Sequence, residues 1–98
     1  MTLQIFLIVT TNCDICKRAE VIMDKAIMES GVDCDVVRHV FDPDGPMSKK
    51  QLIARIAKVN KITDMPGCVF GLGGNVLLRN ELLNRDRIIE EIKNAKRN

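Results

Sequence analysis

Residues 3–16, LQIFLIVTTNCDIC, carry the clearest structural pattern of the chain. Its first part, Leu3–Thr10, is a continuous apolar run rich in β-branched residues, which is typical of a strand buried on both faces. From Cys13 onward, apolar residues recur at a spacing of three to four, and this pattern ends at Gly31. The segment therefore predicts a buried strand that turns directly into an amphipathic helix, with a glycine at the end of the helix.

A second strand and a second helix are predicted next. Cys34–Phe41 reads as a strand, and Asp42–Pro46, which contains two prolines and a glycine, reads as a turn. Ser48 with Gln51 three residues later has the pattern of a capping box, so we expect a helix to begin there. The apolar positions that this helix carries are Leu52, Ile53, Ile56, Ala57 and Val59.

The last third of the chain predicts a hairpin and a terminal helix. Gly71–Asn75 has the composition of a hairpin turn between the strands Cys68–Phe70 and Val76–Leu78. Asn84 is suited to cap a last helix, whose inward positions are Ile88, Ile89, Ile92 and Ala95. We therefore predict one α/β domain over residues 1–98, with a four-stranded mixed sheet flanked by about three helices. Its order is strand, helix, strand, helix, strand, strand, helix.

Composition disfavours several classes of function. The 98 residues are 46% apolar, which is enough for the core of one small domain. The 15 basic and 13 acidic residues are interspersed and Trp and Tyr are absent, so neither a basic stripe nor the best base-stacking side chains are available for nucleic acid. The run Leu3–Val9 is too short to span a bilayer and lacks the flanks of a secretory signal. We expect a cytoplasmic monomer with no membrane or nucleic-acid partner.

Cys13 and Cys16 are the candidate catalytic residues. A reducing compartment argues against a structural disulfide framework, so a C-x-x-C there indicates redox chemistry or metal binding. A cysteine at a helix start faces unpaired N–H groups and the positive end of the helix dipole, which favour the thiolate. Lys17 and Arg18 act in the same direction and Asp14 opposes them. We expect the pKa of Cys13 to lie below that of free cysteine, with Cys13 as nucleophile and the less exposed Cys16 as resolving thiol.

At these residues the chain resembles the thioredoxin–glutaredoxin superfamily, over nearly its whole length. The motifs that carry the resemblance are CDICKR at 13–18 and Asp64-Met-Pro66 before the strand that contains Cys68, followed by the hairpin and the last helix. Within the superfamily the chain is most similar to glutaredoxins and small glutaredoxin-like thioredoxins, since it begins directly with the strand before the dithiol. The resemblance implies a thioredoxin-like fold and a thiol–disulfide oxidoreductase.

The resemblance also implies roles for residues far from the cysteines. In that family the proline at the position of Pro66 is cis and lies beside the dithiol, and the residue before it, here Met65, pairs its backbone with a substrate chain. Met65 and Pro66 are therefore expected to bind substrate, and Lys17 is a candidate contact for an acidic substrate or a glutathione carboxylate. The implied partners are disulfide-containing proteins. Glutathione or a thioredoxin-reductase-like flavoprotein would supply electrons, with no cofactor bound.

Other interpretations of the cysteines are kept as alternatives. Cys13, Cys16, Cys34 and Cys68 could form a zinc site, although zinc ribbons usually supply two short C-x-x-C pairs. An iron–sulfur cluster shared by two chains through Cys13 is a variant of this idea. For Cys34 and Cys68, core packing is the more typical role. The alternative function is a non-catalytic module of the same fold that binds a metal or a protein partner.

Overall fold

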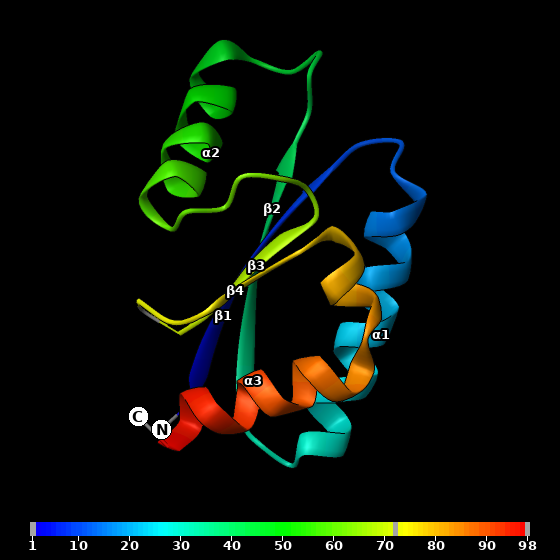
Figure 1. Cartoon of the computed structure of the whole chain (residues 1–98). Coiled ribbons are helices and arrows are strands. Elements are labelled where there is room, and N and C mark those ends of the chain that lie inside the picture. Colours follow the sequence, from blue (N-terminus) through cyan, green and yellow to red (C-terminus); the bar gives the residue numbers. More distant parts are fainter. Residues whose placement is uncertain (1, 72, 98) are drawn as a thin grey trace.

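Four strands, three α-helices and one short 3-10 helix are found in the computed structural model, which describes residues 2–71 and 73–97 (Figure 1). The predicted mixed α/β fold, with a four-stranded sheet and three helices, is confirmed. Within the described ranges, no helix is long and apolar enough to cross a membrane. In chain order the elements are β1 (Leu3–Thr10), α1 (Asp14–Ser30), β2 (Cys34–Phe41), α2 (Met47–Val59), β3 (Gly67–Phe70), β4 (Val76–Leu78), the 3-10 helix η1 (Arg79–Leu83) and α3 (Arg85–Arg97).

The sheet has the strand order β2-β1-β3-β4, so β1 and β3 are the central strands. β1 and β2 are parallel along their whole length, from Leu3 opposite Cys34 to Thr10 opposite Phe41. The helix between them returns the chain to the end of the sheet at which β1 began. β3 runs antiparallel to both β1 and β4. The mixed sheet and the antiparallel β3–β4 hairpin are both as predicted.

Helices cover both faces of the sheet, with α1 and α3 on one face and α2 on the other (Figure 1). Successive residues of β1 point to opposite faces, so Leu7 and Val9 enter the larger core and Ile8 the smaller one. This alternation explains why the whole run is apolar. The buried residues of the larger core are Ile5, Leu7, Val9, Cys16, Ala19, Met23, Ala26, Cys68, Phe70, Leu77, Leu82, Ile88 and Ile92. Those of the smaller core are Ile8, Ile53, Ile62 and Val69.

The ends of α1 and α3 agree with the sequence patterns. Cys13 is the N-cap of α1, and Gly31 ends that helix in the left-handed conformation at φ 68°. Asn84 caps α3, since its side-chain oxygen accepts a hydrogen bond from the Arg87 N–H at 3.1 Å. Of the inward positions predicted for α3, Ile88 and Ile92 are fully buried, and the others pack at the edge of the larger core.

The predicted capping box of α2 is wrong. The helix begins at Met47, its N-cap is Pro46, and the structure gives this cap no side-chain hydrogen bond. Ser48 therefore lies inside the first turn rather than before it. Leu52 and Val59 are also exposed, by 54% and 74%, because α2 presents only a narrow stripe centred on Ile53 to the sheet.

A buried carboxylate connects α3 to the β3–β4 hairpin. Glu91 is 4% exposed, and its Oε2 accepts a hydrogen bond from Asn75 Nδ2 at 2.9 Å. Its other oxygen accepts a hydrogen bond from Arg87 Nε at 3.4 Å. These contacts satisfy a charge that would otherwise be costly to bury. Leu72 of the predicted hairpin turn lies outside the described residues.

Gly73 and Gly74 of this turn are expected to differ in their tolerance of a side chain. At Gly74 an added Cβ would lie 1.9 Å from the Phe70 carbonyl oxygen, so backbone must shift. At Gly73 an added Cβ meets nothing within 4 Å, and only its φ of 69° is unfavourable. We predict that Gly74→Ala lowers the free energy of unfolding by about 2 kcal/mol or more. Gly73→Ala should lower it by about 1 kcal/mol. Denaturant unfolding of the two variants measures the difference, and equal losses would contradict the prediction.

Candidate active site

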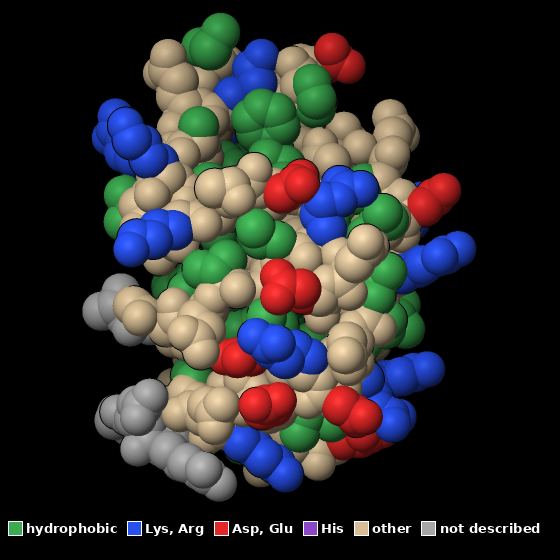
Figure 2. All heavy atoms as spheres, in the orientation of Figure 1, with side chains coloured by type: hydrophobic (Ala, Val, Ile, Leu, Met, Phe, Trp, Pro, Cys, Tyr) green, Lys and Arg blue, Asp and Glu red, His purple; other side chains and the backbone are tan. Residues whose placement is uncertain are grey.

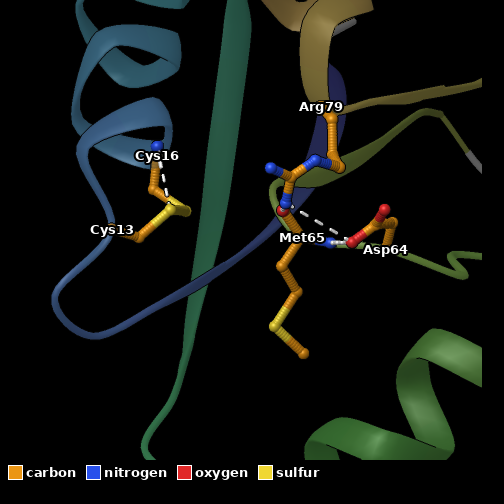
Figure 3. Close-up of polar contacts among 5 residues, drawn as sticks. All are labelled: Cys13, Cys16, Asp64, Met65 and Arg79. Atoms are coloured by element: carbon orange, nitrogen blue, oxygen red, sulfur yellow. Dashed lines mark hydrogen bonds and ion pairs between the residues drawn. A yellow bond between two sulfur atoms is a disulfide. The ribbon is translucent and has the colours of Figure 1, made fainter.

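Cys13 and Cys16 are joined by a disulfide across the first turn of α1 (Figure 3). Their Cα atoms are 5.2 Å apart, and the Cys16 backbone N–H donates a hydrogen bond to Cys13 Sγ at 3.1 Å. Because Cys13 is the N-cap, its sulfur takes the place of the side-chain oxygen that usually accepts from this turn. The same N–H would stabilise a Cys13 thiolate in the reduced protein.

The two cysteines differ in their exposure to solvent. Cys16 is 2% exposed and belongs to the larger core, as expected for a residue inside the first turn. Cys13 is only partly buried. In thiol–disulfide exchange the accessible sulfur is the one that meets an external thiol or disulfide, so the geometry favours Cys13 for that contact.

The end of β1 fixes where Cys13 lies. The Thr10 hydroxyl and the Thr11 N–H both donate to the Phe41 carbonyl, at 2.9 and 3.3 Å. These bonds hold the end of β1 against β2. Asn12 then takes a left-handed conformation at φ 52°, which asparagine tolerates better than most residues, and the chain turns into α1 at Cys13.

Met65 and Pro66 lie at the same end of the sheet as the cysteines. β3 begins with Gly67 opposite Ile8, so continuing this antiparallel register brings Pro66 and Met65 alongside the last residues of β1. The Met65–Pro66 peptide bond is cis, as the resemblance implied.

Asp64 and Arg79 form a ring of polar contacts with the backbone of Met65 (Figure 3). Asp64 Oδ1 accepts from the Met65 N–H at 2.8 Å, and Arg79 Nη1 donates to the Met65 carbonyl at 2.9 Å. The same Asp64 oxygen and Arg79 nitrogen are 3.6 Å apart. The Arg79 N–H also donates to the Pro66 carbonyl, at 2.8 Å.

Neither Asp64 nor Arg79 was predicted from the sequence to have a role in the site. One signal was available for Arg79, because it follows directly after β4, and β4 pairs with β3 so that Leu78 lies opposite Gly67. The residue after Leu78 therefore lies near Pro66. That inference needs the hairpin register, which the glycine-rich turn alone does not define.

A cleft of about 520 Å³ lies beside Met65, between α2 and the end of the sheet. Its walls are mainly apolar, with charged side chains at Lys58, Asp64 and Arg79. The residues that line it are Thr10, Phe41, Ala54, Ala57, Lys58, Ile62, Thr63, Asp64, Met65 and Arg79.

Lys17 does not line this cleft. It is exposed on α1 one turn after Cys13, and with Arg18, Val21 and Ile22 it borders a separate shallow groove. Charged groups of both signs are interspersed on the face seen in Figure 2, in agreement with the sequence. The structure thus joins Cys13 to Cys16 and places Lys17 one turn after Cys13, outside the cleft beside Met65.

Cys34 and Cys68 are free thiols in protected positions. Cys68 is fully buried in β3, and burial raises the pKa of its thiol far above the ordinary value. Cys34 is partly buried; burial and the nearby Asp33 raise the pKa of its thiol, against an opposing effect of Lys96. Among residues 2–71 and 73–97, no three or more His, Cys, Asp or Glu side chains are grouped to hold a metal ion. The four cysteines therefore do not form one tetrahedral site.

Comparison with known proteins shows a shared fold. No family model matches the chain, and no curated protein matches it. A solved structure described as that of a malarial protein is similar, with a TM-score of 0.61, 18% sequence identity, and coverage of 97% of this chain and 98% of the other. At this identity the likeness concerns the architecture alone.

The buried thiol of Cys68 is expected to make folding stability depend on alkaline pH. Its pKa is higher in the folded than in the unfolded chain, so its stabilising contribution is complete below the unfolded pKa, about 8.5, and decreases as pH rises above it. We predict that the wild type loses about 1 kcal/mol more stability than Cys68→Ala between pH 7.5 and about 9.5. Denaturant unfolding at both pH values measures this, and the same pH dependence in both proteins would contradict it.

Proposed function

We propose that this chain is a thiol–disulfide oxidoreductase of thioredoxin-like fold, which reduces protein disulfides or mixed disulfides through Cys13 and Cys16. The observation that carries the proposal is the Cys13–Cys16 disulfide across the first turn of α1, with the partly buried Cys13 at the N-cap and the fully buried Cys16 within the turn. A helix start that presents a half-buried sulfur is the environment in which cysteine becomes reactive.

The architecture supports the thioredoxin-like part of the proposal. The strand order β2-β1-β3-β4, the dithiol directly after the first strand and the helices on both faces agree with the fold that the resemblance implies. The cis Met65–Pro66 bond lies at the same sheet end as the dithiol, which agrees with the family's pattern for this proline.

The reaction would proceed in two exchanges. In the reduced protein the Cys13 thiolate attacks one sulfur of a substrate disulfide; a Cys13–substrate S–S bond forms, the substrate S–S bond breaks, and the released thiolate takes up a proton. The Cys16 thiolate then attacks Cys13 Sγ and releases the second substrate thiol. Two electrons and two protons pass to the substrate, and the Cys13–Cys16 disulfide remains. A glutathione pool or a thioredoxin-reductase-like flavoprotein would return the two electrons.

Burial of Cys16 suits it to the second exchange. Its sulfur meets no external disulfide directly, yet it lies one helical turn from Cys13, so its attack on the mixed disulfide is intramolecular. The mixed disulfide is therefore short-lived in the wild type and should accumulate when this thiol is removed.

Serine substitutions are expected to separate the two steps. In Cys13→Ser the rate of insulin reduction, with dithiothreitol as electron donor, should fall to the uncatalysed rate because no nucleophile remains. Cys16→Ser should retain the first exchange and trap a mixed disulfide with substrate, detectable by mass spectrometry. Cys34→Ser is the matched control and should reduce insulin like the wild type.

The contrary outcome is well defined. Equal rates for the wild type and Cys13→Ser, at the background level, would contradict the proposal. Stoichiometric metal in the purified protein would then favour the alternative, a binding module. If turnover is present, comparing glutathione plus glutathione reductase with thioredoxin reductase identifies the electron donor.

The ionisation of Cys13 provides an independent check. The helix N-terminus and the Cys16 N–H should keep the pKa of the reduced Cys13 thiol below about 8.5, the value for free cysteine. Asp14→Asn should lower this pKa further, since it removes a negative charge next to the thiolate. Alkylation rate against pH, followed for Cys13 by peptide mass spectrometry, measures both. A Cys13 no more acidic than free cysteine would contradict the prediction.

A further inference from the structure

The backbone of Met65 has both of its pairing groups engaged by charged side chains of this chain. Its N–H donates to Asp64 Oδ1 and its carbonyl accepts from Arg79 Nη1, at 2.8 and 2.9 Å. The two side chains also form an ion pair at 3.6 Å, so the contacts make a closed ring (Figure 3). We call this pair of side chains the Asp64–Arg79 latch.

We propose that the Asp64–Arg79 latch covers the strand-pairing groups of Met65 and must open before an extended peptide can pair there. The inference rests on the proposed function, and it concerns the substrate class: small disulfides reach Cys13 with the latch closed, whereas peptide disulfides are slowed by it. Asp64 and Arg79 are thereby specificity-determining residues.

Competition for the Met65 N–H is the first argument. A backbone N–H has one proton, and a peptide that adds as a strand needs it for one of its own carbonyl oxygens. While Asp64 Oδ1 holds that proton, an incoming carbonyl meets a negative carboxylate instead of a donor. Pairing therefore requires that Asp64 first move away, whereas a small disulfide needs no strand pairing to reach Cys13.

The backbone of Arg79 supplies the second argument. Arg79 has φ 45°, a left-handed conformation that glycine adopts more easily than other residues. A glycine could therefore make the same backbone bond from this position to the Pro66 carbonyl with less strain. The arginine adds only its side chain, and the contacts of that side chain are with Met65 and Asp64. A role of the Arg79 side chain in holding Met65 and Asp64 explains why an arginine, rather than a glycine, occupies this left-handed position.

The exposure of the latch makes it reversible. The side chains of Arg79 and Asp64 are 44% and 54% exposed, so both can swing into solvent without disturbing the core. Exposed ion pairs are weak, and hydrogen bonds of this kind contribute modestly. Such a latch slows a competing strand several-fold and does not block it.

The test compares two disulfides that differ in the need for strand pairing. One is bis(2-hydroxyethyl) disulfide, which is small and neutral; the other is a synthetic peptide with one disulfide flanked by uncharged residues. The variants are Asp64→Ala, which frees the Met65 N–H, and Arg79→Gly, which frees the carbonyl and relieves the backbone. Lys61→Gly is the matched control, because Lys61 also has a left-handed φ, 60°, and does not line the cleft.

We expect Asp64→Ala and Arg79→Gly each to raise the ratio of the peptide rate to the small-disulfide rate by about fivefold, the size expected when one competing hydrogen bond is removed. Lys61→Gly should leave this ratio unchanged. An unchanged or lower ratio in the two latch variants would overturn the inference, as would an equal rise in Lys61→Gly, which would assign the effect to backbone strain.

Amide hydrogen exchange gives a readout that does not depend on redox activity. The Met65 N–H should exchange faster in Asp64→Ala than in the wild type, and equal exchange would show that the latch does not hold this proton. The inference and the proposed function fail differently. If wild type and Cys13→Ser reduce neither disulfide above background, the proposed function is wrong. If wild type reduces both and the latch variants leave the ratio unchanged, only the inference is wrong.

Discussion

Burial of β1 on both faces organises the sheet, the two cores and the position of the cysteines. This strand pairs with β2 on one side and β3 on the other, and its side chains enter both cores. A strand covered on both faces has one register that buries all of its apolar residues. That register fixes the position at which the chain leaves the sheet, and so where Cys13 caps α1. It also fixes where β3 begins, and with it the position of Pro66.

The cysteines at this end of the sheet differ in burial, and this difference sets how reactive each thiol can be. Cys13 and Cys16 are separated by one turn, yet Cys13 is only partly buried and Cys16 belongs to the core. Cys68 also lies in that core, and burial raises the pKa of its thiol, so it is held as a neutral packing residue. Position at the helix N-terminus, rather than the presence of a thiol, distinguishes Cys13 from Cys68.

Local patterns predicted most of the elements, because apolar periodicity and turn residues act over a few residues. The run Leu3–Thr10 and the glycine stop at Gly31 were interpreted correctly for this reason. The capping box at Ser48 failed because a capping pattern does not say at which residue a helix begins, and α2 begins earlier, after Pro46. Val59 is apolar yet exposed, because only a narrow stripe of α2 centred on Ile53 contacts the sheet.

The sequence by itself determined the strand-to-helix junction that carries Cys13 and Cys16, since both the buried strand and the helix start are written in consecutive residues. The surfaces on which Lys17 and Met65 lie, by contrast, depend on how distant segments pack, and tertiary structure alone places them. The ring that Asp64 and Arg79 close around Met65 joins residues fifteen positions apart across the β3–β4 hairpin. Such contacts depend on the register of that hairpin and on side-chain directions, which no local spacing encodes.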